Sequence, residues 1–430
     1  MKRLSGKFKI ENPKLFKEKA LQWAFSFSPV CVLDNNHFTN HLHQNTDFII
    51  GAGLADQIIP TNHQSLSDLQ KLLDANQDWV FACLSYDLKN EIEILPSSNS
   101  DFTESPSLFY FVPEMVVELK DEFCIISSLN VSPESVFKTI QSQLITDDEN
   151  AFTLPVKMQS RTNKETYVKD VTQIKEHILN GDVYELNYCQ EFFATDVLVN
   201  TKELFKKLQL KNPAPFSAFL NTGNIQICCS SPERFLLREN NFIYSQPIKG
   251  TAKRGNTFQE DELYKLELKN SEKELAENLM IVDLVRNDLA KCSKTGTIEV
   301  EDLCGVYTYP KVHQLISTVK GKLKEEISFT KIIHNTFPMG SMTGAPKIES
   351  MKLIDQYEKT NRGFFSGSIG FIKPNGDFDF NVVIRSIIYN VEKKYLSVHS
   401  GGAITSDSVA EEEYEESLLK ASALIKLIEE

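Results

Sequence analysis

The sequence lacks any apolar run long enough to cross a membrane. Nowhere do 18 apolar residues follow one another, although a membrane-spanning helix needs about 20. The first residues, MKRLSGKFKIENPKLF, are basic but have no apolar core of the kind that a signal peptide contains. We therefore expect a cytoplasmic protein with no membrane segment.

An excess of positive charge is also missing. The chain has 46 Lys and Arg against 59 Asp and Glu, which gives a formal net charge of −13. Nucleic acids and anionic membranes are bound by clustered Lys and Arg. We expect neither as a partner, and an anionic substrate must therefore be held by local positive groups.

Cysteine is sparse and shows no ligand spacing. The eight cysteines are scattered through 430 residues, and only Cys228 and Cys229 are adjacent. Metal sites and disulfide frameworks have regular cysteine spacings. Reduced thiols are the interpretation that this pattern favours.

The elements that are present favour an α+β fold. Strand-like runs joined by short turns recur, as in FSAFLNTGNIQICCS, where an Asn-Thr-Gly-Asn turn separates two apolar segments. Long helices are predicted over residues 164–181, ended by Gly181, and over residues 259–291. Hairpins with separate long helices favour largely antiparallel sheets over a doubly wound parallel sheet.

Two regions are predicted from composition. Residues 1–150 mix short strands and helices and show no chemistry that we recognise, and residues 127–165, rich in Ser, Asp, Asn and Thr, resemble a connection. All candidate site residues follow that connection. We therefore predict an N-terminal region (1–150) and a catalytic region (160–430).

The last helix carries an acidic stripe. At 3.6 residues per turn, Glu413, Glu416 and Lys420 align with the apolar residues of SDSVAEEEYEESLLKASALIKLIEE. An acidic first turn alone is explained by the helix dipole. Because this stripe continues the apolar face, we expect two carboxylates and an amine to point inward.

Glu277 lies in the apolar helical segment ENLMIVDLV, on one face with Met280 and Ile281. A buried carboxylate needs a cation or a hydrogen-bonding partner. For this helix alone, a structural ion pair and a metal site are equal alternatives. Together with Glu413 and Glu416, three inward carboxylates suit Mg²⁺, which prefers oxygen ligands.

Arg385 is predicted on a strand face in FDFNVVIRSIIYN. A guanidinium in such apolar surroundings pairs either with a buried Asp or with a ligand carboxylate, and the residues alone leave both open. The glycine-rich segments GSMTGAP and SGGAI are places where the backbone can approach a ligand closely. The first also leads into a helix N-terminus, which can hold an anion.

Three further residues have both a structural and a functional interpretation. Lys249 in QPIKGTAKRG is an amine between an apolar residue and a Gly-Thr turn. Glu233 in SSPERFLL follows a Ser-Pro turn, where an acid either lies on the surface or projects into a cleft. His313 in VHQLIS is more typical of a core histidine than of a catalyst when it is considered alone.

Taken together, these segments resemble the chorismate-utilising enzymes. The resemblance covers about residues 167–430, through DVYELNYCQ, SSPERFL, PIKGTAKRG, AENLMIVDLVRNDL, VHQLIS, GSMTGAPKIESM, FNVVIRS and SGGAITSDSVAEEEYEESLLKA, all in family order. It implies a sandwich of two largely antiparallel sheets with helices on the outside. In relatives the region that corresponds to residues 1–150 holds tryptophan, so the resemblance also implies a tryptophan-pocket region there.

The resemblance implies a role for each candidate residue. Mg²⁺ would be held by glutamates that match Glu277, Glu413 and Glu416, and would bind the ring carboxylate of chorismate. The other substrate-binding positions are Arg385, which matches the arginine for the enolpyruvyl carboxylate, together with Lys420, Gly344, Ala345, Gly401, Gly402 and Thr251.

Two catalytic positions follow from the same resemblance. Glu233 matches the general acid that protonates the departing 4-hydroxyl, which is needed because hydroxide is a poor leaving group. His313 matches the family histidine beside the ring and the metal-bound carboxylate.

Lys249 distinguishes the branches of the family. Anthranilate synthases usually have Pro-Ile-Ala-Gly-Thr here, and their ammonia attacks C2 of the ring. In the aminodeoxychorismate synthase branch a lysine attacks C2, expels the 4-hydroxyl and is displaced when ammonia adds at C4. The resemblance therefore implies amination at C4, which leads to 4-aminobenzoate and folate.

Glu185 is the main departure from the family patterns. Isochorismate and salicylate synthases have a lysine base at this position, and the amine-using relatives often have Gln. A glutamate there can in principle act as a base, so a minor water-adding activity stays open.

The nitrogen source is expected on another chain. No cysteine lies in a Gly-x-Cys-x-Gly nucleophile turn, so the sequence contains no glutaminase of that type. The resemblance thus implies ammonia from a separate glutamine amidotransferase subunit. The alternatives are anthranilate synthase component I and a metabolite-binding subunit without activity.

Overall fold

The structure is a computed structural model that describes residues 2–38, 42–43, 47–58, 64–95, 97–145 and 156–429. Its helices are α1 (Pro13–Ala24), α2 (Ser65–Ala75), η1 (Tyr86–Leu88), α3 (Lys89–Ile92), α4 (Pro133–Gln141), α5 (Lys164–Asn180), α6 (Thr201–Lys211), α7 (Phe258–Asn270), α8 (Glu272–Cys292), α9 (Phe329–Thr336), η2 (Gly340–Met342), α10 (Lys347–Tyr357) and α11 (Ala410–Glu429). Its strands are β1 (Leu4–Lys9), β2 (Val30–Asp34), β3 (Phe48–Ala52), β4 (Val80–Leu84), β5 (Leu108–Phe111), β6 (Met115–Lys120), β7 (Phe123–Ser128), β8 (Gln159–Ser160), β9 (Glu185–Ala194), β10 (Phe216–Asn221), β11 (Ile225–Ser231), β12 (Arg234–Glu239), β13 (Phe242–Gln246), β14 (Ile248–Lys253), β15 (Glu299–Thr308), β16 (Val312–Lys322), β17 (Gly344–Ala345), β18 (Ser368–Ile372), β19 (Phe378–Asn381), β20 (Ser386–Asn390) and β21 (Tyr395–Ile404).

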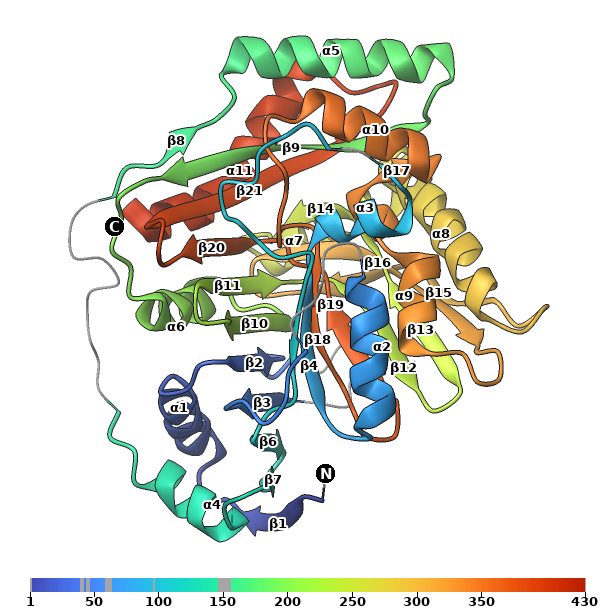
Figure 1. The fold of residues 1–430 in the computed structure, drawn as a ribbon. Coiled ribbons are helices and arrows are strands. Elements are labelled where there is room, and N and C mark those ends of the chain that lie inside the picture. Colours follow the sequence, from blue (N-terminus) through green and yellow to red (C-terminus); the bar gives the residue numbers. More distant parts are fainter. Residues whose placement is uncertain are drawn as a thin grey trace.

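Two antiparallel sheets form the body of the molecule (Figure 1). In the described chain, the twelve-stranded sheet has the order β1-β7-β6-β3-β2-β10-β11-β20-β21-β9-β17, with β8 paired to β9. The nine-stranded sheet has the order β14-β16-β13-β12-β19-β18-β4-β5, with β15 paired to β16. Helices lie on the outside of the sheets. The predicted α+β sandwich is confirmed.

Both sequence regions contribute to both sheets. Strand β2, from residues 1–150, pairs with β10 of the larger sheet, and β4, from the same region, pairs with β18 of the smaller one. The division at about residue 150 therefore does not separate one sheet from the other. As a domain boundary it stays a prediction. Part of the predicted connection, residues 146–155, lies outside the described residues.

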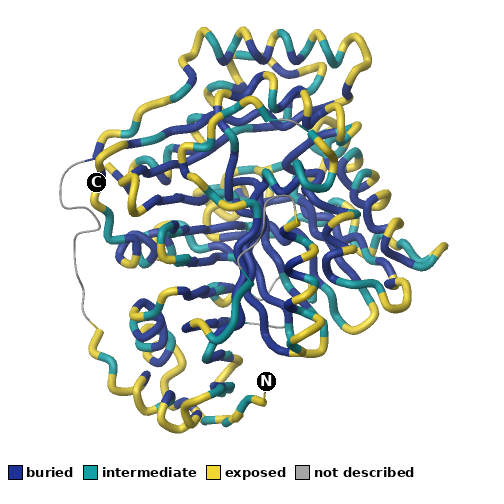
Figure 2. Tube along the Cα trace, viewed as in Figure 1, coloured by how far each residue is buried: buried dark blue, intermediate teal, exposed yellow. Residues whose placement is uncertain are grey.

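Alternating apolar residues place the strands between two layers of core. In β2, Cys31 and Leu33 belong to the cluster between the sheets, whereas Val30 and Val32 belong to the cluster that includes α1 and α11. This division follows from the pleat, because successive side chains of a strand point to opposite faces. Figure 2 shows the result, in which the strands are mostly buried and the outer helices are exposed on one side.

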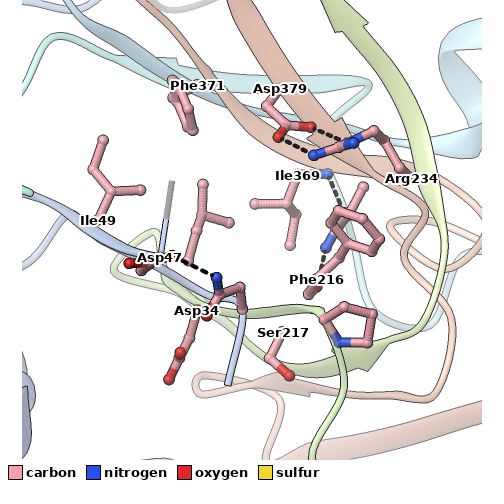
Figure 3. Close-up of a pocket in the computed structure, with 13 residues that line it drawn as sticks. Asp34, Asp47, Ile49, Phe216, Ser217, Arg234, Ile369, Phe371 and Asp379 are labelled. Carbon is pink, nitrogen blue, oxygen red and sulfur yellow. Dashed lines mark hydrogen bonds and ion pairs between the residues drawn. The ribbon is translucent and has the colours of Figure 1, made fainter. Parts of the chain in front are cut away.

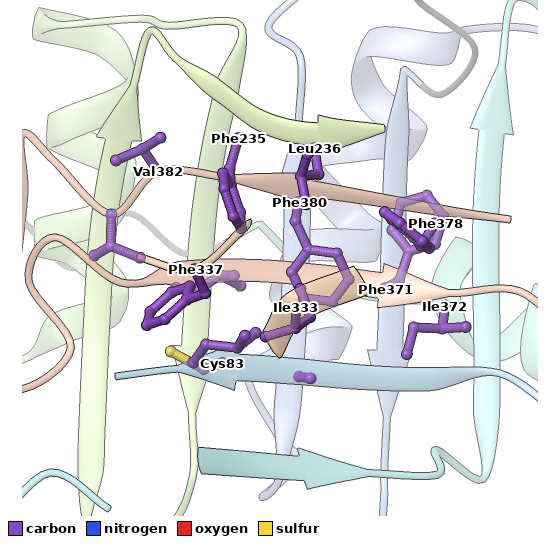
Figure 4. Packing of buried hydrophobic residues seen from close by; sticks show 14 of the residues in the cluster. Cys83, Phe235, Leu236, Ile333, Phe337, Phe371, Ile372, Phe378, Phe380 and Val382 are labelled. Carbon is purple, nitrogen blue, oxygen red and sulfur yellow. The ribbon is translucent and has the colours of Figure 1, made fainter. Parts of the chain in front are cut away.

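Aromatic side chains fill the layer between the nine-stranded sheet and α9 (Figure 4). Phe329 packs against Phe378 and Phe380, with ring centroids 5.0 and 5.2 Å apart. Phe337 packs edge-on against Phe235 at 6.0 Å. Truncating one such ring to alanine typically costs about 3–5 kcal/mol, so this layer fixes the sheet that carries β14.

The two long predicted helices had different outcomes. The first is confirmed as α5, and Gly181 ends it in the left-handed conformation (φ 84°). The second is wrong as a single helix, because α7 ends at Asn270 and α8 begins at Glu272. Between them Ser271 is extended, and its hydroxyl accepts from the Glu274 N–H as a helix cap. No described helix is both long and apolar enough to span a membrane.

A buried ion pair joins the end of α10 to β9. Both carboxylate oxygens of Glu358 accept from Arg362, at 2.6 and 2.9 Å. Arg362 also donates to the carbonyl oxygens of Met342 and Asn187, and Glu358 accepts from the Cys189 N–H. This network holds η2 and β9 together beside the strand β17.

We expect Glu358→Ala to lower the free energy of unfolding by about 3–5 kcal/mol, because it leaves a buried guanidinium unpaired. Urea-induced unfolding measures the loss. The matched control is Glu349→Ala on α10, whose ion pair with Lys352 is half exposed and is worth less than about 1 kcal/mol. Equal losses in the two variants would contradict the structural role of the buried pair.

A small cavity lies between the two sheets (Figure 3). Asp34 and Ile49 line it from the N-terminal region, and Phe216, Arg234 and Asp379 line it from the catalytic region. Arg234 donates to both oxygens of Asp379, at 2.9 Å each. The cavity measures about 40 Å³, which is room for a few water molecules. The tryptophan-pocket region stays a prediction.

Candidate active site

The predicted site residues come together where β14, an edge strand of the smaller sheet, faces β9 and β21 of the larger one. The Lys249 Nζ on β14 lies 4.0 Å from the Glu185 Oε1 on β9. A Cβ placed on Gly402 of β21 would lie 3.4 Å from both Glu413 Oε2 and Lys420 Nζ. Helices α8 and α11 therefore supply carboxylates to a site that both sheets enclose.

A β-bulge positions Lys249. The register between β14 and β16 shifts between Ile248 and Thr251, and Gly250 has a φ of 91°. A bulge re-aims the side chain that it carries, and only 10% of the Lys249 side chain is exposed. The predicted Gly-Thr turn is therefore wrong as a turn, because these residues form an irregular strand. Thr251 is exposed on that strand, so its substrate contact stays a prediction.

Glu233 is a buried acid at the start of β12. The Ser341 hydroxyl of η2 donates to its Oε1 at 2.6 Å. Burial raises the pKa of Glu233 to about 7, although the Ser341 hydrogen bond and the positive charge of Lys249 act in the opposite direction. A carboxyl group with this pKa is still partly protonated at neutral pH and can donate a proton there.

Carboxylates of α8 and α11 line the other side. Burial raises the pKa of Glu277 to about 7, with Lys249 opposing. Burial likewise raises the pKa of Glu413, although the Ser408 hydroxyl donates to it at 2.7 Å. Burial also acts to raise the pKa of Glu416, but Lys420, 2.5 Å away, holds it below its ordinary value.

Glu274 was missed by the sequence reasoning. It lies one turn before Glu277 on α8, and its pKa is raised mainly by burial and also by the negative charge of Glu416 on α11. The signal was present as a Glu-x-x-Glu spacing that occurs in both helices, at residues 274–277 and 413–416. Four carboxylates thus share the space that three were predicted to occupy.

The carboxylates fit a divalent cation in donor type and charge. Among the described residues, no three His, Cys, Asp or Glu side chains lie close enough to one another to hold an ion by themselves. Mg²⁺ uses one or two carboxylates and completes its shell with water or substrate oxygens. Because burial disfavours the charged forms of Glu274, Glu277 and Glu413, a cation would relieve that cost.

The glycines of SGGAI and GSMTGAP differ in role. A Cβ on Gly401 would lie 2.0 Å from the Tyr188 carbonyl oxygen, and one on Gly344 would lie 2.2 Å from that of Glu185. These two positions are needed for strand packing. Gly402 instead borders the carboxylates and Lys420, and Ala345 pairs with Glu185 across β17 and β9. Their substrate contacts stay predictions.

Gly402→Val is expected to raise the KM for the chorismate that the family resemblance implies about tenfold or more, because its methyl groups would displace the carboxylates around the ligand. Its melting temperature should stay near that of the unchanged protein. Gly401→Ala should instead lose about 1–3 kcal/mol of stability through the backbone clash. Steady-state kinetics and thermal unfolding compare them, and a loss of stability confined to Gly402→Val would contradict these assignments.

Arg385 does not lie in a strand, so that prediction is wrong. It lies between β19 and β20 with a φ of 52°, and its carbonyl oxygen accepts from the Ser230 N–H. This conformation is uncommon for a residue other than glycine. Its Nη1 donates to the Lys420 carbonyl oxygen at 2.6 Å, and the Lys420 Nζ donates to the Gly401 carbonyl oxygen at 3.2 Å. Arg385 thus reaches the site beside α11.

His313 is fully buried, and both ring nitrogens have protein partners. Nε2 lies 2.9 Å from the Asp261 Oδ1, and Nδ1 lies 3.0 Å from the Thr308 hydroxyl. Arg254 in turn forms an ion pair with Asp261. Neither ring nitrogen is therefore free, and the catalytic role of His313 stays a prediction.

Comparisons with known proteins show which family the chain resembles. The family model described as chorismate binding enzyme matches residues 27–426. The chain is 31% identical over 445 residues to aminodeoxychorismate synthase component 1 of Escherichia coli (strain K12), with 96% of this chain and 97% of that protein covered. It is 45% identical over 272 residues to the probable aminodeoxychorismate synthase, chloroplastic, of Oryza sativa subsp. japonica. That match covers 62% of this chain but 30% of the rice protein. The chain thus spans less than a third of that plant relative.

The fold has a similar counterpart among solved structures. Anthranilate synthase component I from Streptococcus pneumoniae TIGR4 superposes with a TM-score of 0.75 at 26% identity, and 93% of this chain and 92% of that one are covered. The family match spans most of the chain, and the relative from Escherichia coli is matched over nearly its whole length. The chain therefore belongs to the family of chorismate binding enzymes.

Proposed function

We propose that this chain is the synthase component of an aminodeoxychorismate synthase. It would aminate chorismate at C4 with ammonia and so supply the synthesis of 4-aminobenzoate and folate. The observation that carries the proposal is the Lys249 amine, which a bulge directs into a carboxylate-lined site. The full-length similarity to the Escherichia coli protein of that name supports it.

In the first half-reaction, the uncharged Lys249 amine attacks C2 of the ring. Both ring double bonds shift, from C1=C2 and C5=C6 to C1=C6 and C4=C5, and the bond from C4 to its hydroxyl oxygen breaks. Glu233 gives its proton to that oxygen, so that water leaves rather than hydroxide. The buried position of Glu233 and its raised pKa support this role.

In the second half-reaction, ammonia forms a bond to C4 and both double bonds shift back to C5=C6 and C1=C2. The bond between C2 and the Lys249 nitrogen breaks, and its electron pair returns to that nitrogen. The sum is chorismate plus ammonia giving 4-amino-4-deoxychorismate plus water. The enzyme thus recovers its lysine without a net change.

Substrate binding is assigned to the surrounding charges. Glu277, Glu413 and Glu416 would hold Mg²⁺, which when bound neutralises the ring carboxylate of chorismate. Arg385 and Lys420 would meet the enolpyruvyl carboxylate. The hydrogen bond from Arg385 to the Lys420 carbonyl oxygen supports this, because it places the Arg385 guanidinium beside the turn of α11 that carries Lys420.

The proposal includes a separate partner. Ammonia would come from a glutamine amidotransferase subunit, which the name component 1 of the Escherichia coli relative suggests for that protein. A cytoplasmic location stays a prediction, and the eight unpaired cysteines are compatible with a reducing compartment.

Product identity tests the proposal against its nearest alternative. The similarity to anthranilate synthase component I makes that activity the second candidate. Purified protein is incubated with chorismate, Mg²⁺ and an ammonium salt, and the products are separated and identified. We expect 4-amino-4-deoxychorismate. Anthranilate fluorescence without an added lyase would contradict the proposal, and absence of turnover would indicate a subunit without activity.

A further inference from the structure

Glu185 has an unsatisfied carboxylate oxygen beside the nucleophile. It is the first residue of β9 and is 1% exposed. Its Oε1 lies 4.0 Å from the Lys249 Nζ, which is beyond hydrogen-bonding distance. Within the described chain, its buried Oε2 has no hydrogen-bond partner. One oxygen is therefore weakly paired and the other is not paired at all.

A small hydrogen-bond donor would stabilise this buried, unpaired oxygen. Leaving a buried acceptor unpaired costs about 1–3 kcal/mol, and more for a charged group. Chorismate brings two more carboxylates, which are repelled. A compact cation with several N–H donors matches the site in both size and charge.

We propose that Glu185 is the docking site for the ammonium ion that provides the nitrogen of the product. The inference rests on the proposed function and assigns a residue to its second substrate. Once Lys249 is bonded to C2, its nitrogen is committed to the ring and Glu185 is left without an amine partner. C4 lies two bonds further round the ring, so a nitrogen held by Glu185 is close to the carbon that it attacks.

The proton transfers balance. Ammonium gives one proton to Glu185 and becomes ammonia. Ammonia attacks C4, the bond between C2 and the Lys249 nitrogen breaks, and the product leaves with an ammonium group at C4. Glu185 then holds the proton taken from ammonium, and Glu233 lacks the proton that left with water, so one proton passed from Glu185 to Glu233 through solvent returns both acids to their starting states.

The test separates the two half-reactions in Glu185→Gln. Enzyme is mixed with chorismate and Mg²⁺ without ammonium, and the covalent adduct, heavier by chorismate minus water, is followed by intact-mass spectrometry. Ammonium chloride is then added and loss of the adduct is timed. We expect adduct formation within about threefold of the unchanged enzyme. Glutamine, which amine-using relatives often have at this position, still accepts an N–H but neither attracts the cation nor takes its proton, so adduct loss should be slowed about tenfold, with a raised KM for ammonium.

Several outcomes would overturn the inference. Adduct loss at the normal rate would show that Glu185 does not handle ammonium. Slowing confined to adduct formation would assign Glu185 to Lys249 instead. If the unchanged enzyme makes isochorismate without ammonium and Glu185→Gln does not, the unpaired Glu185 oxygen would instead bind and activate water.

Two controls keep the result interpretable. Glu191→Gln removes a carboxylate on the same strand whose oxygens already accept from Arg161, Tyr395 and Ser397, and its KM for ammonium should not change. Thermal unfolding shows whether Glu185→Gln is folded, and adduct formation shows that its site is intact. If the unchanged enzyme aminates C4 without any adduct, the proposed function fails in its Lys249 step, while the KM for ammonium still tests Glu185.

Discussion

Lys249→Ala is expected to abolish formation of 4-amino-4-deoxychorismate, with a loss of at least about 10³-fold in kcat. The reason is chemical, because no other described amine lies on the bulge of β14, and direct attack at C4 would have to expel hydroxide without the covalent step. A trace of amination at C2 is the expected residual activity. Product separation after incubation with chorismate, Mg²⁺ and ammonium measures both.

Two matched variants separate nucleophilic from electrostatic roles of Lys249. Lys249→Arg keeps the positive charge but cannot be deprotonated, so it should be as inactive as Lys249→Ala. Lys253→Ala removes an exposed lysine from the same strand, where the amine lies over the Tyr264 ring, and activity should stay within about twofold. Substantial activity in Lys249→Arg would contradict a covalent role.

Glu233→Gln is expected to lower kcat by about 10²–10⁴-fold while leaving chorismate binding nearly unchanged. Glutamine keeps the shape of the side chain and can still contact Ser341, but it has no proton to give to the departing hydroxyl. The pH profile provides the specific signature. Because the donor must be protonated and its pKa is about 7, kcat/KM for chorismate should fall tenfold per unit above about pH 7.

Ser341→Ala should move that falling limb to higher pH, because the hydroxyl lowers the pKa of Glu233. Stability provides a control, because Glu233→Gln should lower activity without lowering the stability of the protein. The folded-state pKa of Glu233 is above its ordinary value of 4.5, so its charge costs stability as pH rises from about 4.5 through 7. Glu233→Gln should therefore unfold no more easily than the unchanged protein at pH 8. A pH limb that persists in Glu233→Gln would assign it to another group.

Local patterns predicted many strands and helices, but the acidic stripe only in part, because Glu413 is buried whereas 49% of the Glu416 side chain is exposed. The alternation in β2 and the stripe that places Glu413 on the buried face of α11 are periodic features. Each of them can be seen in a short window of sequence. The order of strands cannot, because pairing of β4 with β18 joins residues almost 300 positions apart. The break at Ser271 was predictable in principle, since a Ser-x-x-Glu cap stands there.

The site was predicted less completely, for physical reasons. Glu274 was overlooked because it lies in the charged segment SEKE before the apolar stretch of the helix, where an acid is expected to face solvent. Arg385 was predicted in a strand because its neighbours are apolar. No residue of FNVVIRS indicates that the backbone of Arg385 adopts the left-handed conformation. The two glycines of SGGAI cannot be told apart in sequence, yet Gly401 packs on β9 and Gly402 borders the carboxylates.

The most direct test of the central claim is the mass of the unchanged protein after mixing with chorismate and Mg²⁺ in the absence of ammonium. We expect a covalent adduct of chorismate minus one water, located by peptide mapping on the segment that contains Lys249 and lost when ammonium is added. Rapid formation of 4-amino-4-deoxychorismate by a protein that never shows this adduct, at any time after mixing, would contradict it.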